Sequence, residues 1–131
     1  MTIEPHIAVV IPVLSEHSVM EETIKHFRSL NYPNFDLIVV TTEKENFLYG
    51  ENKSIQALTQ LKSQYSFIHF HYPNHIGTKS DQINFALNKW KGVHETKFYD
   101  DSFFAIYDAD SRPNKSVLYD FAYTYSRQLD E

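Results

Sequence analysis

Two carboxylates one residue apart are the first feature of this chain that could do chemistry. Asp108 and Asp110 follow an apolar run, 103–107, and Pro113 closes the polar stretch after them. Oxygen donors at the end of a buried strand suit a hard divalent cation, which keeps some waters and takes its other ligands from substrate phosphates. Taken alone, the pattern is equally typical of a turn whose aspartates hydrogen-bond their own backbone. It indicates a metal site only if other parts of the chain bring suitable groups to it.

Polar groups also follow three other apolar runs of the sequence. They are Ser15 and Glu16, the Thr-Thr-Glu-Lys segment 41–44, and the Gly-Thr-Lys segment 77–79. Each could be an ordinary loop, and the Gly-Thr-Lys segment matches only part of a phosphate-binding loop. Because the carboxyl ends of parallel strands lie along one edge of a sheet, we expect these groups to gather beside the two aspartates. Such a mixture would suit a nucleotide whose diphosphate binds a metal.

Strands and helices are predicted to alternate along the whole chain. Apolar, β-branched runs predict strands, and apolar residues at helical spacing predict helices. The strands are expected at 7–14, 35–42, 65–72 and 103–107, and the helices at 16–30, 52–64, 79–90 and 114–129. This order predicts an α/β fold, a three-layer α/β/α arrangement with a mostly parallel, Rossmann-like sheet, as one domain over residues 1–131.

Local signals refine this prediction at four places. Ser15 stands where the N-cap of the first helix belongs. Pro12 cannot donate to a strand ladder, so pairing should fail near the end of the first strand. The segment 43–46 (Glu-Lys-Glu-Asn) is interpreted as a polar break, and 92–101 as a polar connection.

Composition excludes several classes of protein. The chain has a net charge of −5 and no long block of basic residues, which argues against a nucleic-acid partner. It contains no cysteine, so disulfides and thiolate metal sites are excluded. No apolar run approaches the ~18 residues that a membrane span needs, and the N-terminus lacks a signal-peptide pattern. We therefore expect a cytoplasmic protein.

Four segments, in order, resemble the nucleotide-binding half of family-2 glycosyltransferases, which have the GT-A fold. Two of the similar segments are strands with the residues after them: 7–16, with its Ile-Pro-Val and Glu, and 36–45. The other two are 77–87, a Gly-x-Lys segment with its Asn and Ala-Leu, and 107–113, an Asp-x-Asp motif with its following proline. Many members carry Asp-Asp-Gly-Ser after the second strand, where this chain has Thr-Thr-Glu-Lys at 41–44. The family's second half is missing, which makes the chain resemble a truncated GT-A domain.

The resemblance implies a parent enzyme that transfers a sugar from a nucleotide-diphosphate sugar to an acceptor hydroxyl. It implies Mg²⁺ or Mn²⁺ held by Asp110 with Asp108 nearby, Asp108 also facing the donor, and Lys79 near the diphosphate or base. The base would be lined by Pro12, Val13, Thr42 and Glu43. The catalytic base and the site for a saccharide or lipid-linked acceptor belong to the missing half, so this fragment should transfer no sugar. The parent could lie at the cytoplasmic face of a membrane.

Two other classes of protein remain as alternatives. A non-enzymatic Mg²⁺-binding α/β module of the receiver type would need an acidic pair after the first strand, where this chain has Pro12-Val13-Leu14-Ser15. A nucleotidyltransferase with a related fold would need a glycine-rich, basic loop at the same place. The sequence favours neither.

Overall fold

The computed structural model describes residues 4–93 and 102–129 and contains a single parallel sheet. Its strands are β1 (His6–Pro12), β2 (Phe35–Thr42), β3 (Ile68–Tyr72) and β4 (Ser102–Ile106). They lie in the order β3-β2-β1-β4, and every neighbouring pair is parallel. The predicted Rossmann-like α/β fold is confirmed.

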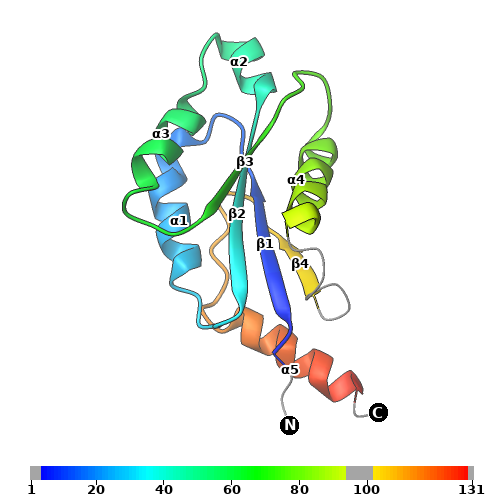
Figure 1. Ribbon diagram of the computed structural model, residues 1–131. Helices are drawn as coiled ribbons and strands as arrows, with labels where there is room; N and C mark the ends of the chain where they lie inside the picture. The colour runs from blue at the N-terminus through cyan, green and yellow to red at the C-terminus, as the bar shows by residue number, and fades with distance from the viewer. Residues whose placement is uncertain (1–3, 94–101, 130–131) are drawn as a thin grey trace.

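Helices cover both faces of this sheet (Figure 1). A 3-10 turn, η1 (His17–Val19), precedes α1 (Met20–Arg28); the other helices are α2 (Glu43–Tyr49), α3 (Lys53–Leu61), α4 (Lys79–Val93) and α5 (Val117–Leu129). Residues such as Val9 and Val39 pack in one core with side chains of α1, α3 and α5. Val10 and its neighbours pack in a second core with α4. Because β1 and β2 are buried on both faces, their sequences are apolar at nearly every position.

Pro12 lies at the end of β1, and strand pairing there fails on one side only. Val13 N still donates to Val40 O in β2 at 2.9 Å. On the other side the last pair is Val10 with Ile106, and Tyr107 N donates to Val10 O at 3.1 Å. Since alternate residues of a parallel strand face opposite neighbours, the N–H that Pro12 lacks would point toward β4, beyond the end of that ladder. The proline is therefore tolerated where pairing has already stopped.

Two local predictions about the loops were wrong. Ser15 is not an N-cap: its φ is 53°, and α1 begins only at Met20, after η1. The polar break predicted at 43–46 is the first turn of α2, since Thr42 Oγ1 accepts a hydrogen bond from Lys44 N at 3.1 Å and caps the helix. Gly50, with a φ of 76°, ends it.

The other boundaries differ from the prediction by a few residues. β3 begins at Ile68, α3 ends at Leu61, α4 continues to Val93, and α5 begins at Val117. The connection predicted at 92–101 begins inside α4, and 94–101 lie outside the described residues. Within the described part of the chain, no helix is long and apolar enough to cross a membrane.

Candidate functional site: a pocket at the carboxyl edge of the sheet

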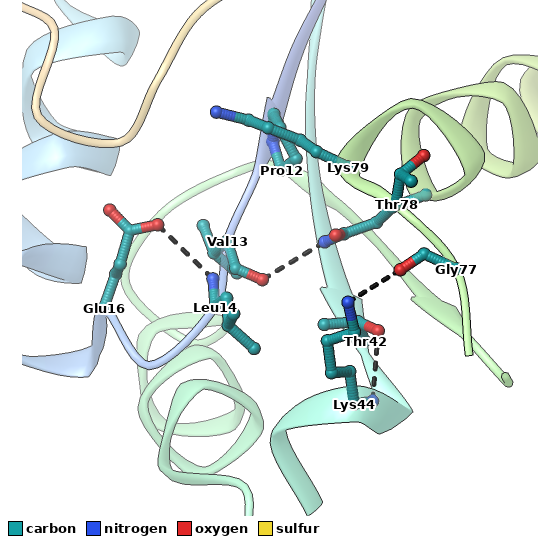
Figure 2. A pocket seen from close by; sticks show the side chains of 10 residues that line it. Pro12, Val13, Leu14, Glu16, Thr42, Lys44, Gly77, Thr78 and Lys79 are labelled. Atoms are coloured by element: carbon teal, nitrogen blue, oxygen red, sulfur yellow. Dashed lines mark hydrogen bonds between the residues drawn. The ribbon is translucent and has the colours of Figure 1, made fainter. Parts of the chain in front are cut away.

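A pocket of about 240 Å³ opens where β1 and β2 end and α4 begins (Figure 2). Its lining comes from the loops predicted at the strand ends, with Gln82 of α4 added to them: Pro12, Val13, Leu14, Glu16, Thr42, Lys44, Gly77, Thr78, Lys79 and Gln82. The topology brings these loops together because all four strands point their carboxyl ends the same way. This edge of an open α/β sheet is where ligands of such folds bind.

The start of α4 forms one wall of the pocket and has a fixed geometry. Thr78 N donates to Asp81 Oδ2 at 2.7 Å, and Asp81 N donates to Thr78 Oγ1 at 3.3 Å, a reciprocal cap of the first turn. Gly77 precedes it with a φ of 137°, and an added Cβ would lie 3.0 Å from the hydroxyl of Tyr72. From the opposite wall, Lys44 Nζ donates to Gly77 O at 2.7 Å. The loop that carries Lys79 is thus held on two sides.

Gln82 closes the inner end of the pocket. It is 6% exposed, and its Nε2 donates to Val13 O at 3.1 Å and to Val40 O at 2.6 Å, joining the ends of β1 and β2. Gln82 is not among the site residues predicted from the sequence. A signal existed, because Gln82 stands four residues before the buried Ala86 on the same stripe of α4.

Neither predicted aspartate lines the pocket, and Asp108 is joined to it through an ion pair with Lys79. Both aspartates belong to a turn that is anchored through the residue between them. Ala109 is buried, and its carbonyl accepts hydrogen bonds from Thr23 Oγ1 at 2.6 Å and from Arg112 Nη1 at 2.8 Å. Asp108 and Asp110 are both exposed on either side of it. The backbone of the turn is therefore held by α1 while both carboxylates stay accessible.

Lys79, Asp108 and Asp110 all act electrostatically on Glu16. Lys79 Nζ forms an ion pair with Asp108 Oδ1, and both side chains are more than half exposed. Burial raises the pKa of Glu16, with Asp110 and Asp108 adding to the rise; a hydrogen bond from Leu14 N and the charge of Lys79 oppose it. Lys79 thus lies near two carboxylates, Asp108 and Glu16, and Asp110 lies near Glu16.

Glu43 is placed differently from the other predicted base-lining residues. Pro12, Val13 and Thr42 line the pocket, whereas Glu43 is not among its lining residues. Its Oε2 lies 3.5 Å from His71 Nε2, on β3. Lys44, the next residue in the sequence, is the member of this segment that reaches the pocket.

Asp108 and Asp110 fit a divalent cation that is completed by its substrate. Within 4–93 and 102–129, no group of three or more His, Asp or Glu side chains is arranged to hold a metal by itself. Mg²⁺ and similar ions commonly bind one or two carboxylates, waters and the phosphates of a nucleotide, and two exposed aspartates beside a lysine match that donor set. Asp108 would have to exchange Lys79 for the metal.

Comparisons with known proteins concern the fold. No protein-family profile and no curated protein sequence matches the chain. Among solved structures, the chain is similar to a mannosyltransferase from Pyrobaculum calidifontis, determined in complex with GDP-Man and Mn²⁺. The superposition has a TM-score of 0.67 at 18% identity, and it covers 95% of this chain and 32% of that one. The chain thus has a Rossmann-like α/β fold of the kind found in glycosyltransferases, and it spans about a third of that neighbour's length.

Proposed function

We propose that this chain is the donor-binding part of a metal-dependent, family-2-like glycosyltransferase. The parent enzyme would move a sugar from a nucleotide-diphosphate sugar to an acceptor hydroxyl. The observation that carries the proposal is the pocket at the carboxyl edge of the sheet, which is lined by Lys79; this lysine pairs with Asp108, and Asp108 and Asp110 are both exposed. The fold shared with a mannosyltransferase solved with GDP-Man and Mn²⁺ supports it.

In this proposal different residues bind different parts of the donor. Pro12, Val13 and Thr42 surround the nucleobase, and Lys79 neutralises the diphosphate. Asp110 and Asp108 would hold Mg²⁺ or Mn²⁺. A bound ion of this kind supplies Lewis-acid stabilisation of the leaving nucleoside diphosphate. Glu43, the remaining residue suggested by the family resemblance, would act on the base only from outside the pocket, next to His71.

No residue of this chain is proposed as the base that deprotonates the acceptor. That base, and the site for a saccharide or lipid-linked acceptor, would lie in another part of the parent protein. We propose a cytoplasmic location, with the parent at the cytoplasmic face of a membrane. The chain itself is expected to bind donor nucleotides weakly and to transfer no sugar.

Calorimetric titration with UDP and GDP, each with and without Mn²⁺, tests this proposal. We expect millimolar or tighter binding that weakens by at least about tenfold without the metal, because the ion bridges the aspartates and the diphosphate. Asp110→Asn should remove the dependence on Mn²⁺, whereas Asp120→Asn, an exposed aspartate of α5, should retain it. Binding that does not depend on the metal, or no binding of either nucleotide, would contradict a donor site.

A further inference from the structure

Gln82 holds its side-chain amide in one orientation. Both groups that its amide nitrogen contacts, Val13 O and Val40 O, are backbone carbonyls, which can only accept hydrogen bonds. The nitrogen must therefore face the two strand ends, and the alternative assignment of the amide is chemically excluded. The orientation of Oε1 follows from the ends of β1 and β2.

The oxygen of the same amide remains available to a ligand. Oε1 of Gln82 accepts no hydrogen bond from residues 4–93 or 102–129. Since it is not one of the fully inaccessible unpaired atoms in these ranges, it is accessible from outside the protein. Gln82 as a whole is 6% exposed, and it lines the pocket. The pocket is thus the route by which this acceptor can be reached.

A donor accompanies this acceptor in the pocket. Lys44 lines the same cavity, and one of the three N–H groups of its ammonium is used by Gly77 O. The structure gives Lys44 no second acceptor among the described residues. A ligand in the pocket therefore meets one fixed acceptor, Gln82 Oε1, and one cationic donor, Lys44 Nζ.

We propose that Gln82 determines which nucleobase the pocket accepts, by taking a hydrogen bond from a ring N–H. Uracil at N3 and guanine at N1 carry such an N–H beside a carbonyl oxygen, which Lys44 can contact. Cytosine and adenine present a ring nitrogen acceptor there, which would face Oε1 lone pair to lone pair. The inference rests on the proposed donor site and adds its specificity: nucleoside diphosphates with a lactam or imide edge.

The wild-type chain tests this with matched ligands. UDP, GDP, CDP and ADP are titrated with Mn²⁺, and inorganic pyrophosphate with Mn²⁺ serves as the ligand without a base. We expect UDP and GDP to bind about ten- to a hundredfold more tightly than CDP and ADP, because a site built around a hydrogen bond rejects a ligand that leaves its buried group unpaired. N3-methyl-UDP should bind as weakly as CDP, whereas 5-methyl-UDP, with a methyl group of equal size away from the ring N–H, should bind like UDP.

A variant tests the residue itself. Gln82→Met keeps the length of the side chain and removes both the acceptor and the amide donor to Val13 O and Val40 O. The preference for UDP over CDP should fall to about threefold or less, while an unchanged pyrophosphate affinity would show that the phosphate end of the site is intact. Circular dichroism and the unfolding midpoint establish that the variant is folded, and the ligand series on the wild type does not depend on it. Equal affinity for all four nucleotides, a preference for CDP or ADP, or tight binding of N3-methyl-UDP would overturn the role of Gln82. Failure of pyrophosphate and every nucleotide to bind would instead overturn the donor site, and the inference with it.

Discussion

His69 and His71 share one hydroxyl, and their arrangement makes the protein sensitive to acid. Both rings contact Thr41 Oγ1 at 2.8 Å, through His69 Nε2 and His71 Nδ1. Burial, together with the neighbouring His71 and Lys62, lowers the pKa of His69 to about 4. The folded chain therefore holds His69 uncharged at neutral pH.

This arrangement predicts a loss of stability between about pH 6.5 and pH 4. The unfolded chain takes up a proton on His69 near its ordinary pKa of about 6.5, whereas the folded chain resists it, so the free energy of unfolding falls as the pH drops through this window. We expect His69→Gln to reduce this fall by about 1 to 2 kcal/mol, a figure discounted for partial solvent screening. Urea unfolding at pH 7 and at pH 4.5 measures it. His75→Gln, at an exposed ring, should leave the fall as in the wild type.

Alanine substitutions at two glycines of the α4 region are expected to change the stability of the fold in opposite directions. Gly77→Ala should destabilise the fold by about 1 to 3 kcal/mol, because the φ of 137° disfavours a side chain and the new Cβ would lie 3.0 Å from Tyr72 Oη and 3.1 Å from Asp81 Oδ2. Gly92→Ala meets no atom within 4 Å inside the helix. It should stabilise the protein by a few tenths to about 1 kcal/mol. Chemical denaturation of both variants tests the contrast, and a neutral Gly77→Ala would show that the loop can relax.

At the scale of elements, a buried carboxylate connects three parts of the carboxyl edge. Glu45 in α2 is 2% exposed. Its carboxylate accepts hydrogen bonds from Ser15 N at 2.5 Å, from Ser54 N at 3.1 Å and from Ser54 Oγ at 2.8 Å. It thereby holds the loop after β1 in its left-handed turn and caps the first turn of α3. The negative charge there also complements the helix dipole.

Removing this carboxylate should loosen the loop that lines the pocket. Glu45→Ala is expected to cost about 2 to 4 kcal/mol, because the buried N–H and hydroxyl of Ser54 and the N–H of Ser15 lose their acceptor. Hydrogen exchange of the Ser15 amide should accelerate by more than the global loss of stability explains, and urea unfolding separates the two effects. Glu51→Gln, at an exposed glutamate nearby, should change neither quantity.

The burial pattern of each element explains whether the sequence could predict it. The strands were predictable because β1 and β2 are buried on both faces and so are apolar at most positions. Helix α2 was missed because its buried residue is Glu45, whereas Phe47, Leu48 and Tyr49 are exposed, so its periodicity contradicts its packing. Ser15 was misinterpreted as a cap because its backbone is set by a glutamate thirty residues away.

In the candidate site, too, residues at predicted strand and helix ends could be found from the sequence, whereas a residue that depends on tertiary contacts could not. Asp108, Asp110 and Lys79 were found by residue type and position at predicted strand and helix ends. Gln82 could not be identified as a pocket residue from type alone, since its role depends on two strand ends that only the folded sheet brings together.

For the molecule as a whole, binding of metal and nucleotide should appear as stabilisation of the fold. A ligand that binds only the folded chain raises its stability by about 2.7 kcal/mol at a concentration one hundred times its dissociation constant. We expect UDP with Mn²⁺ to raise the unfolding midpoint clearly, and UDP alone or Mn²⁺ alone to raise it little. Thermal unfolding with all four combinations measures this. A full shift with UDP alone would contradict the proposed role of the metal.

The ion pair between Lys79 and Asp108 gives this stabilisation a cooperative form. In the free chain these two side chains are bound to each other. A cation that binds Asp108 therefore frees Lys79, and a diphosphate that binds Lys79 frees Asp108. Each ligand thus prepares the site for the other, and by reciprocity each must raise the affinity of the other by the same factor. Lys79→Met should weaken this coupling: Mn²⁺ alone would bind Asp108 more readily, while its effect on the affinity for UDP would shrink.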